Sequence, residues 1–337
     1  MDKKELLKIA EKINDNWQKQ MPDVGPCHWE RSAYMIGNMA AYEITKKEEY
    51  LDYAYRWAVR NEWKFNDGSF FGVDQRCADN QLCAEVYFKL IDMGLSGATD
   101  ENILEDMKPL MEEERCDYWS WCDLIYMGFT FYHLMANRYN DKSYEEKVYR
   151  LYKNIRDDRK CYDKEDHFWH RDENYLPEVK REDNGEKIFW GRGNGWAFAG
   201  LARGLEVVDK NCKYYDEYVK DYKDMAESLK TVMNDDGSFN VSFYDKETYP
   251  YHETSSTSLI CLGYLMGIRL GILDESYYEV ADKCVDWLFT VALDEDGSVG
   301  WCQDVAGWPA HNVGKDVKKD YAVGTFLLII KELFLRK

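Results

Sequence analysis

Apolar residues recur along this chain at the three-to-four-residue spacing of an α-helix, while the strict alternation of a half-buried strand is rare. Only six prolines interrupt the 337 residues, so long helices can form. The spacing and the helix-breaking residues together predict about twelve helices, over residues 3–18, 30–45, 47–63, 76–93, 100–114, 120–139, 142–158, 192–208, 213–234, 254–270, 275–293 and 318–335.

The stretch 161–189 departs from this periodicity. From position 167 onward the sequence reads HFWHRDENYLPEVKREDNGEKIFW, in which charged residues, aromatic residues and turn formers alternate without a helical face. We expect a long loop or a short pair of strands there. Long segments without regular structure often carry function, so this stretch is a candidate for part of a site.

A short motif recurs after three of the predicted helices. It reads NDGSF at 66–70, DDGSF at 235–239 and DGSV at 296–299, and Asp-Gly pairs favour turns. The last two copies lie about 60 residues apart, close to one helical hairpin with its loops, whereas the ~34-residue signature of a tetratricopeptide solenoid is absent. Twelve helices paired in this way predict an all-α fold, an (α/α)6 barrel with an inner and an outer ring.

We predict that residues 1–337 form a single domain of this kind, because no Gly/Ser/Pro-rich linker divides the chain. In such a barrel the inner helices begin at one mouth. A site would therefore be built there, from the connecting loops and the first helical turns.

Composition and charge narrow the possible partners. Hydrophobic residues make up 45% and charged residues 32%, which is typical of a folded globular protein. The net charge of −19 disfavours nucleic acid, whose binding depends on Lys and Arg meeting phosphate, and also disfavours an anionic membrane surface. The same charge could simply keep the protein soluble. An anionic sugar would need a local basic pocket. No apolar run reaches the ~18 residues of a membrane span.

Aromatic residues are frequent, with 26 Tyr and 12 Trp. They either fill the core or stack on sugar rings, since Tyr and Trp combine a flat apolar face with a polar group. The ten cysteines are dispersed, with no CxxC pair and no zinc-type spacing, so we expect free thiols. The N-terminal segment is a charged amphipathic helix. We therefore expect a cytoplasmic location, or a periplasmic one if a leader precedes this chain. The sequence carries no signal of oligomeric state.

The densest motif is FWGRGNGW at 189–196. Its three alternating glycines allow a sharp turn and a close approach of the backbone to a neighbour. A helix begins here, so its positive dipole end and the Arg192 guanidinium face the same space, and Arg192 could pair with a carboxylate. The alternative is a structural turn with Arg192 in a salt bridge. A dinucleotide site is disfavoured, because no βαβ context surrounds the motif.

Two acidic residues are candidates for proton transfer. Asp123 lies in the first turn of a predicted helix among Trp119, Trp121 and Tyr126. Apolar neighbours should raise its pKa and the helix dipole should lower it, and a general acid at neutral pH needs the first effect to prevail. Asp79 also lies near a predicted helix start, in DQRCADNQ at 74–81. Either residue could instead merely cap a helix or complement its dipole.

Two weaker motifs contain histidine. HFWHRD at 167–172 lies in the irregular stretch, and its two histidines could contact substrate or form a structural pair. Metal binding is disfavoured, because no further ligand cluster accompanies them. HETSS at 252–256 opens another helix, and we interpret it mainly as capping.

These segments together resemble glycoside hydrolase families 88 and 105, the unsaturated glucuronyl and rhamnogalacturonyl hydrolases. The resemblance rests on WGRGNGW at 190–196, WCDLIYM at 121–127, Asp79 before an aliphatic helix, and FWH at 168–170. WGRGNGW is the most specific of these motifs. The resemblance extends roughly from Trp29 to the last helix, and the family fold is an (α/α)6 barrel, which agrees with the independent helix count.

The resemblance implies a role for individual residues. Asp123 falls on the catalytic acid/base and Asp79 on an assisting carboxylate. Arg192 and His170 fall on substrate-contacting positions, and Trp196 would line the sugar. From the same motifs we expect further substrate contacts from Trp190, Asn194 and Trp121. The resemblance implies no metal and no cofactor. The segment HWERSAYMIGNMA at 28–40 matches the first inner helix of the family only loosely, which leaves the choice of sugar open.

The implied substrate is an oligosaccharide with a 4,5-unsaturated uronic acid at its non-reducing end, as a polysaccharide lyase leaves it, and an unsaturated rhamnogalacturonyl type is favoured. Asp123 would protonate C4, water would add at C5, and the resulting hemiketal would collapse and release the sugar. Unlike a retaining glycosidase, such an enzyme needs no protein nucleophile.

Two other hypotheses remain compatible with the residues. One is a different (α/α)-barrel enzyme. An inverting glycosidase would need an acid and a base ~6.5–9.5 Å apart, and a sugar epimerase would favour paired catalytic histidines, whereas this chain has only six His. The other is a non-catalytic glycan-binding helical protein, for which Asp123→Asn would leave function intact.

Overall fold

The computed structural model describes residues 1–67 and 76–336. This part of the chain contains twelve α-helices, which confirms the predicted number. Their bounds are α1 Lys3–Gln20, α2 Trp29–Thr45, α3 Glu48–Arg60, α4 Ala84–Asp92, α5 Glu101–Glu112, α6 Leu124–Tyr139, α7 Ser143–Lys153, α8 Gly191–Val207, α9 Tyr215–Val232, α10 Thr254–Arg269, α11 Tyr278–Trp287 and α12 Asp320–Leu335.

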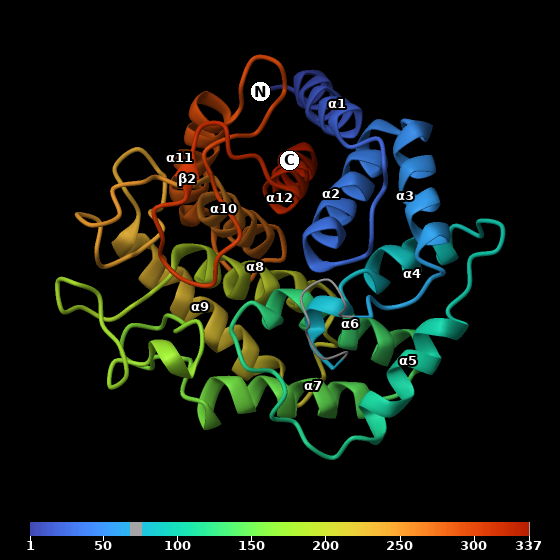
Figure 1. Ribbon diagram of the computed structural model, residues 1–337, viewed down its shortest axis with the longest axis horizontal. Coiled ribbons are helices and arrows are strands. Elements are labelled where there is room, and N and C mark those ends of the chain that lie inside the picture. The colour runs from blue at the N-terminus through green and yellow to red at the C-terminus, as the bar shows by residue number, and fades with distance from the viewer. Residues whose placement is uncertain (68–75, 337) are drawn as a thin grey trace.

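The helices form two concentric rings (Figure 1). The even-numbered helices pack against one another in the order α2, α4, α6, α8, α10 and α12, and the ring closes where α12 packs on α2. Among the odd-numbered helices, α1 packs on α12 and α2, α3 packs on α2 and α4, and α7, α9 and α11 each pack on the inner helix that precedes them in the chain. In Figure 1, α1, α3 and α7 lie at the rim, while α2, α6 and α8 lie nearer the centre. The predicted (α/α)6 barrel is therefore confirmed.

Burial differs between the two rings, as their sequences require. Every residue of α8 from 191 to 205 is buried, and so is every residue of α10 from 254 to 268, because these helices are enclosed on all sides. The outer helices are amphipathic. In α9, for example, the buried residues recur at helical spacing and charged side chains occupy the opposite face. No helix in the described residues combines the length and apolarity that crossing a membrane requires.

One predicted helix is wrong in its first half. Residues 76–93 were expected to be one helix, but α4 begins only at Ala84, after a short 3₁₀ turn over Ala78–Asn80. The Asn80 carbonyl accepts a hydrogen bond from the Asn66 amide at 3.0 Å. Because that carbonyl is paired with another segment, the backbone hydrogen bonds around it join residues three apart, as in a 3₁₀-helix, and not four apart, as in an α-helix. Asp79 lies in this turn and not in a regular helix.

Loops and turns follow the sequence signals closely. The stretch 161–189 is irregular, with a single bridge between Tyr162 and Trp169 and a 3₁₀ turn over Glu173–Tyr175, as expected. Gly237 and Gly297 both adopt left-handed conformations, with φ of 86° and 89°, in two matching Asp-Gly turns. The predicted turn at 66–70 extends beyond the described residues. A small sheet pairs β1 Cys302–Gln303 with β2 Val313–Gly314 just before α12.

Candidate active site

A pocket of about 360 Å³ opens where the inner helices begin. Its wall combines the residue before α6, the first turns of α2 and α8, the 3₁₀ turn before α4, and the loop that precedes α12. Six of the predicted site residues line it, namely Asp79, Trp121, Asp123, Trp190, Arg192 and Trp196. The pocket therefore lies at the mouth where the sequence led us to expect a site, and the site itself stays a prediction.

The two predicted carboxylates face this common space. Asp123 directly precedes α6, and its carbonyl accepts hydrogen bonds from Tyr126 and Met127, so the start of the helix fixes its backbone. Asp79 reaches the same pocket from the turn before α4. Both side chains keep part of their surface open to the pocket, while protein surrounds the rest.

This environment changes how the two groups titrate. Burial, reinforced by the negative charge of Asp123, raises the pKa of Asp79 to about 7. Burial also raises the pKa of Asp123, although the Arg171 guanidinium opposes this effect. Burial therefore outweighs the positive charges and hydrogen bonds that would lower the pKa of Asp123, which is the direction that a general acid requires.

Arg171 is the positive charge with the largest effect on the pKa values of the two carboxyl groups, and it was missed as a site residue in the sequence. Its guanidinium stacks over Trp121 at 4.9 Å from the ring centre, and its Nη1 donates to Asp172. Its Nη2 has no hydrogen-bond partner among the described residues. Its carbonyl accepts the Cys122 amide at 2.9 Å, so it is tied to the backbone beside Asp123. The sequence signal was its place directly after the FWH motif.

Arg192 lines the pocket, but both of its terminal nitrogens are already saturated with hydrogen bonds. Its Nη1 donates to the carbonyl of Gln303 at 2.8 Å and to the hydroxyl of Tyr321 at 3.0 Å. Its Nη2 donates to the carbonyls of Asp304 at 3.1 Å and Ala306 at 3.0 Å. These four bonds use all four protons on the terminal nitrogens. Arg192 therefore fixes the loop at 303–306 and has no terminal N–H left for the carboxylate of a ligand.

Gln303 is a second positioning residue that the sequence did not reveal. Its backbone N–H donates to the Glu253 carboxylate at 2.7 Å. The same carboxylate accepts the backbone N–H groups of Ser255 and Ser256 and so caps α10, as expected for HETSS. The Gln303 side-chain oxygen accepts the Trp190 indole N–H at 2.8 Å, and its side-chain nitrogen donates to the Trp308 carbonyl at 3.0 Å. One buried glutamine thus links α8, α10 and the loop before α12.

Aromatic rings form the walls of the pocket. Trp196 meets Trp29 edge-on at 6.1 Å and Tyr126 at 4.5 Å between ring centres. Trp29 also stacks on Tyr321 at 5.3 Å. Trp308 closes the rim and keeps 49% of its surface exposed. Flat apolar faces around two carboxyl groups and a cation suit a sugar ring that carries a charged substituent.

The alternating glycines serve close packing and not a sharp turn. Gly191 and Gly195 both lie within α8, with ordinary helical geometry. A methyl group on Gly191 would overlap the carbonyl oxygen of Asn240, and one on Gly195 would press against Leu259 of α10. The expected close approach is confirmed, whereas the expected turn is wrong, since the helix already begins at Gly191.

His170 was predicted to contact substrate, but it does not line the pocket. Only 1% of its surface is exposed, its ring stacks on Phe189 at 4.8 Å, and its Nδ1 lies 3.2 Å from the Ile188 carbonyl. Its Nε2 lies 3.6 Å from the Asp163 carboxylate. A ring enclosed on both sides in this way holds the 161–189 loop in place, next to Arg171.

Asn194 was also expected to contact substrate and is likewise buried beneath the pocket wall. Its side-chain oxygen accepts the Trp169 amide at 2.7 Å, and its nitrogen donates to the carbonyls of Trp169 and Trp190, both at 3.0 Å. These bonds fasten the irregular loop to the first turn of α8. All side-chain hydrogen bonds of Asn194 go to the backbone of Trp169 and Trp190, so Asn194 positions the wall of the pocket.

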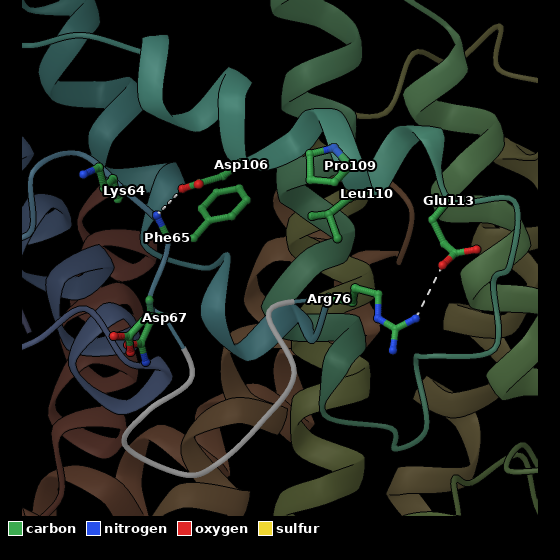
Figure 2. A pocket seen from close by; sticks show the side chains of 9 residues that line it. Lys64, Phe65, Asp67, Arg76, Asp106, Pro109, Leu110 and Glu113 are labelled. Atoms are coloured by element: carbon green, nitrogen blue, oxygen red, sulfur yellow. Dashed lines mark hydrogen bonds and ion pairs between the residues drawn. The ribbon is translucent and has the colours of Figure 1, made fainter.

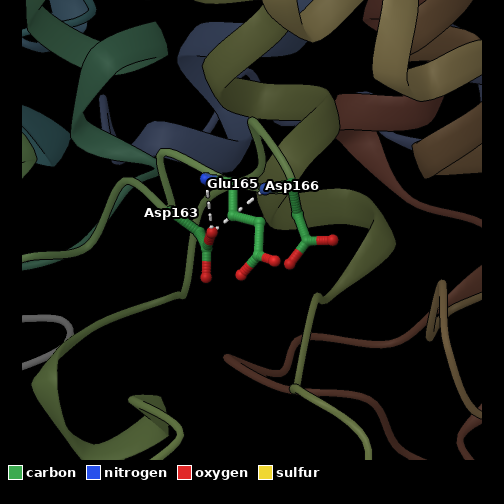
Figure 3. Close-up of side chains that lie close together, drawn as sticks. All are labelled: Asp163, Glu165 and Asp166. Atoms are coloured by element: carbon green, nitrogen blue, oxygen red, sulfur yellow. Dashed lines mark hydrogen bonds between the residues drawn. The ribbon is translucent and has the colours of Figure 1, made fainter.

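An acidic cluster on the same loop, formed by Asp163, Glu165 and Asp166, lies outside the pocket (Figure 3). Its oxygen atoms come within 4.8 Å of one another. The Lys187 ammonium donates to all three carboxylates, at 2.7, 3.3 and 2.6 Å respectively. Burial would raise the pKa of Asp163, but the hydrogen bonds from His170 and Lys187 prevail and hold it well below the usual value. The cluster therefore stabilises the loop as an ion-paired group.

A second cavity, of about 440 Å³, lies beside α5 (Figure 2). Its polar groups are engaged with one another. Asp106 accepts the Phe65 amide at 3.0 Å, and Arg76 pairs with Glu113 at 3.5 Å. Because these partners are already matched, the carboxylate-bearing pocket at the barrel mouth remains the stronger candidate site.

A helical double ring with a carboxyl pair in a tryptophan-walled pocket defines a carbohydrate-active barrel enzyme. The family model of Glycosyl Hydrolase Family 88 matches residues 3–336, and the chain belongs to this family of glycoside hydrolases. It is 26% identical over 341 residues to an unsaturated 3S-rhamnoglycuronyl hydrolase of Formosa agariphila, with 94% of this chain and 87% of that protein covered.

Two solved structures are also similar. A family 88 glycosyl hydrolase from Bacteroides vulgatus matches with a TM-score of 0.93 at 29% identity, over 99% of both chains. A protein described as a polysaccharide lyase matches with a TM-score of 0.92 at 31% identity, over 99% of this chain and 97% of that one.

Proposed function

We propose that this enzyme removes a 4,5-unsaturated uronic acid from the non-reducing end of oligosaccharides that a polysaccharide lyase has produced. The observation that carries the proposal is the Asp79–Asp123 pair, whose raised pKa values keep a proton available near neutral pH in a tryptophan-walled pocket. The name of the Formosa agariphila relative favours a glycuronyl residue joined to rhamnose as the substrate class.

The reaction is a hydration of the ring double bond. Asp123 donates its proton to C4, and positive charge develops at C5 and the ring oxygen. A water molecule then bonds to C5 and returns a proton to the Asp123 carboxylate, which restores the acid. The hemiketal at C5 opens to a ketone, the freed hydroxyl leaves a hemiacetal at C1, and this collapses to an aldehyde as the remaining sugar departs with its oxygen. No bond to the protein forms.

Asp79 assists this step through charge. Its carboxyl group and that of Asp123 repel each other when both are ionised, which favours the state in which the pair retains one proton. When Asp123 has given its proton to C4, the resulting negative charge stabilises the cationic ring. Trp196 and Trp29 hold the ring between these groups.

Arg171 is the residue that we propose holds the carboxylate of the substrate. A conjugated uronate carboxylate needs a donor beside the reacting ring, and Arg192 has no free terminal N–H, because all four bond to the loop at 303–306 and to Tyr321. Arg171 has an unpartnered Nη2 among the described residues and lines the same pocket. It also lies close enough to Asp123 to lower the pKa of that carboxyl.

Replacement of each arginine distinguishes these roles. We expect Arg171→Ala to raise KM roughly 10–100-fold, as loss of a hydrogen bond between charged groups does, with a melting temperature near that of the parent. We expect Arg192→Ala to lower the melting temperature as well, since it releases the loop at 303–306. An unchanged KM in Arg171→Ala would contradict the assignment.

The function itself is tested by ultraviolet absorbance of unsaturated oligosaccharides from rhamnogalacturonan, glycosaminoglycan and ulvan. Loss of the conjugated enol-ether band with one of them, absent in Asp123→Asn, supports hydration and identifies the substrate class. A gain of absorbance on saturated polysaccharide would instead support the lyase activity suggested by the description of one similar structure. No change with any of them would overturn the proposal.

A further inference from the structure

Tyr126 lies directly behind the wall of the active-site pocket, in the first turn of α6. Its backbone N–H donates to the Asp123 carbonyl at 2.9 Å, and its ring meets Trp196, which lines the pocket, at 4.5 Å between ring centres. Tyr126 is fully buried, and its hydroxyl has no hydrogen-bond partner among the described residues. The orientation of this ring is therefore set by packing and not by a hydrogen bond.

A second neighbour of the Tyr126 ring is a buried cation. The Arg203 guanidinium lies over the ring at 4.3 Å from its centre, within the range of a cation–π interaction. Its Nη2 donates to the Glu85 carboxylate on α4, and each of these two side chains is only 7% exposed. Its Nη1 has no hydrogen-bond partner within the described part of the chain. The guanidinium is thus held by the carboxylate and by the face of the tyrosine ring.

Trp196 and Arg203 reach Tyr126 from the same face of α8. The two residues are seven positions apart, nearly two helical turns, so they lie above one another at a spacing of roughly 10 Å along the helix axis. Gly200 lies between them, and a methyl group there would overlap the backbone nitrogen of Tyr126 at 2.6 Å. The two helices therefore meet closely at Tyr126, with the tryptophan on the pocket side of this contact and the arginine beyond it.

A cavity of about 130 Å³ lies beside the ion pair, deeper in the barrel than the active-site pocket. Glu85, Arg203 and Thr130 all line it, and the Thr130 hydroxyl has no hydrogen-bond partner among the described residues. A side chain that borders open space is not fixed by packing on that side. The bond to Glu85 is therefore what keeps the guanidinium over the Tyr126 ring.

This ion pair is a weak source of stability. Burial raises the pKa of Glu85 even though the positive charge of Arg203 opposes this effect. The cost of removing the carboxylate from water thus exceeds the gain from its partner. When both members of a buried ion pair are replaced together by uncharged side chains, stability is often unchanged or higher. The contribution that remains for the pair is to fix the position of the ring that it touches.

We propose that Arg203, held by Glu85, is a positioning residue for the reaction and acts through the Tyr126 ring to fix the angle of Trp196 in the pocket. The proposal rests on the proposed function, because Trp196 is one of the rings that hold the unsaturated sugar beside Asp123. Without the cation, the tyrosine ring can turn and the indole turns with it. The sugar then lies less often within reach of the Asp123 proton, which lowers the rate.

The test removes both charges at once, in Glu85→Gln/Arg203→Met, so that no buried charge is left unpaired. The substrate is whichever unsaturated oligosaccharide loses its enol-ether band. We expect kcat/KM to fall about tenfold, but to change less than about twofold when the same replacement is made in Trp196→Phe, because the ring to be positioned is gone. Arg269→Met/Glu332→Gln removes an ion pair between α10 and α12 and should leave kcat/KM at the parent value, as the matched control.

Arg203→Lys is a second, milder variant, since it keeps the charge but loses the flat group over the ring. We expect a smaller fall in kcat/KM with the same dependence on Trp196. Near-ultraviolet circular dichroism gives a readout that does not depend on turnover. The tryptophan bands of Arg203→Lys should differ from those of the parent, and this difference should disappear when both carry Trp196→Phe.

Two results would overturn the proposal. One is an unchanged kcat/KM in both Arg203 variants. The other is a fall of equal size with and without Trp196, which would mean that the ion pair supports the fold in general. If the parent enzyme leaves every enol-ether band intact, the proposed function fails, and the dichroism alone then decides whether Arg203 positions Trp196.

Discussion

At the scale of single residues, the chemistry of this enzyme depends on a few side chains with unusual surroundings. Asp79 and Asp123 are surrounded by protein in a pocket with tryptophan walls, so each carboxyl group retains its proton to higher pH than a surface carboxyl does, although the Arg171 guanidinium opposes this effect. Arg171 and Arg192 line the same pocket, yet only the first has an unpartnered terminal nitrogen. The hydrogen-bond partners of each side chain, more than its type, decide its role.

Asp123→Asn tests the identity of the proton donor. We expect kcat to fall by about 10²–10⁴-fold, because the amide can neither give a proton to C4 nor accept one from water. The melting temperature should not fall, since the parent carboxyl is destabilised by burial. Enol-ether absorbance gives the rate and circular dichroism gives the melting curve. Retention of most activity would exclude the mechanism.

The pH profile tests the shared proton. Since the pKa of Asp79 is raised to about 7, the pair retains its proton below that value and loses it above. We expect kcat/KM to fall as pH rises through about 7, and Asp79→Asn to move this limb. Glu30, which lies outside the pocket lining and whose pKa burial also raises to about 7, provides the control. A limb that moves in Glu30→Gln but not in Asp79→Asn would contradict the assignment.

At the scale of elements, the site is an assembly of helix beginnings and the loops before them. The starts of α2, α6 and α8 supply one wall each, and the loop before α12 supplies the rim. Gly191 allows α8 to begin directly against the chain at Asn240, which brings Arg192 to the loop that it organises. Close packing at one helix start is therefore linked to the geometry of the whole pocket.

Gly191→Ala tests this link. The new methyl group would meet a backbone carbonyl that cannot rotate away, so we expect a loss of about 1–3 kcal/mol in the free energy of unfolding, with reduced activity. Denaturant titration measures the first effect. Gly314→Ala is the control, because a methyl group there would meet only Val317 at an ordinary 3.5 Å. Equal stability of both variants would show that α8 can shift to accommodate the change.

At the scale of the whole molecule, the barrel buries α8 and α10 over most of their length and places the two candidate carboxyl groups at one mouth. The ten cysteines, all within the described residues, are free. The net charge of the chain is −19, while the active-site pocket combines two carboxyl groups with two arginines. Stability and activity therefore oppose each other at Asp79, where the enzyme keeps a carboxyl group that prefers to be neutral.

This opposition predicts how stability depends on pH. The pKa of the Asp79 carboxyl is raised in the folded state. Its contribution to the free energy of unfolding is therefore fully present below about 3.9, the pKa of an aspartate in the unfolded chain, and is lost as pH rises through about 7. We expect Asp79→Asn to melt ~2 °C or more above the parent at pH 8, with the difference shrinking towards pH 4. Scanning calorimetry at both pH values measures it. A constant difference would mean that Asp79 does not titrate as described.

The sequence by itself determined the elements and much of the chemistry. Apolar periodicity gave all twelve helices because it reflects a local requirement, the need of each helix to bury one or more faces. Asp-Gly pairs gave the turns at 236–237 and 296–297, since glycine accepts left-handed geometry at little cost. Six of the eight predicted site residues line the pocket, because their motifs stand at the beginnings of inner helices.

Only the tertiary structure decided which groups are free to act. Arg192 and the carbonyls that accept hydrogen bonds from its terminal nitrogens lie more than 110 residues apart in the chain, so no local pattern shows that these nitrogens are engaged. His170 and Asn194 are enclosed by segments packed against them, and the helix expected at 76–93 is shortened by a bond from Asn66. Arg171 and Trp308 join the pocket through long-range packing. Whether a side chain is buried and whether its hydrogen-bonding groups are paired depend on contacts between residues far apart in the chain. The spacing of residues within one segment does not specify those contacts.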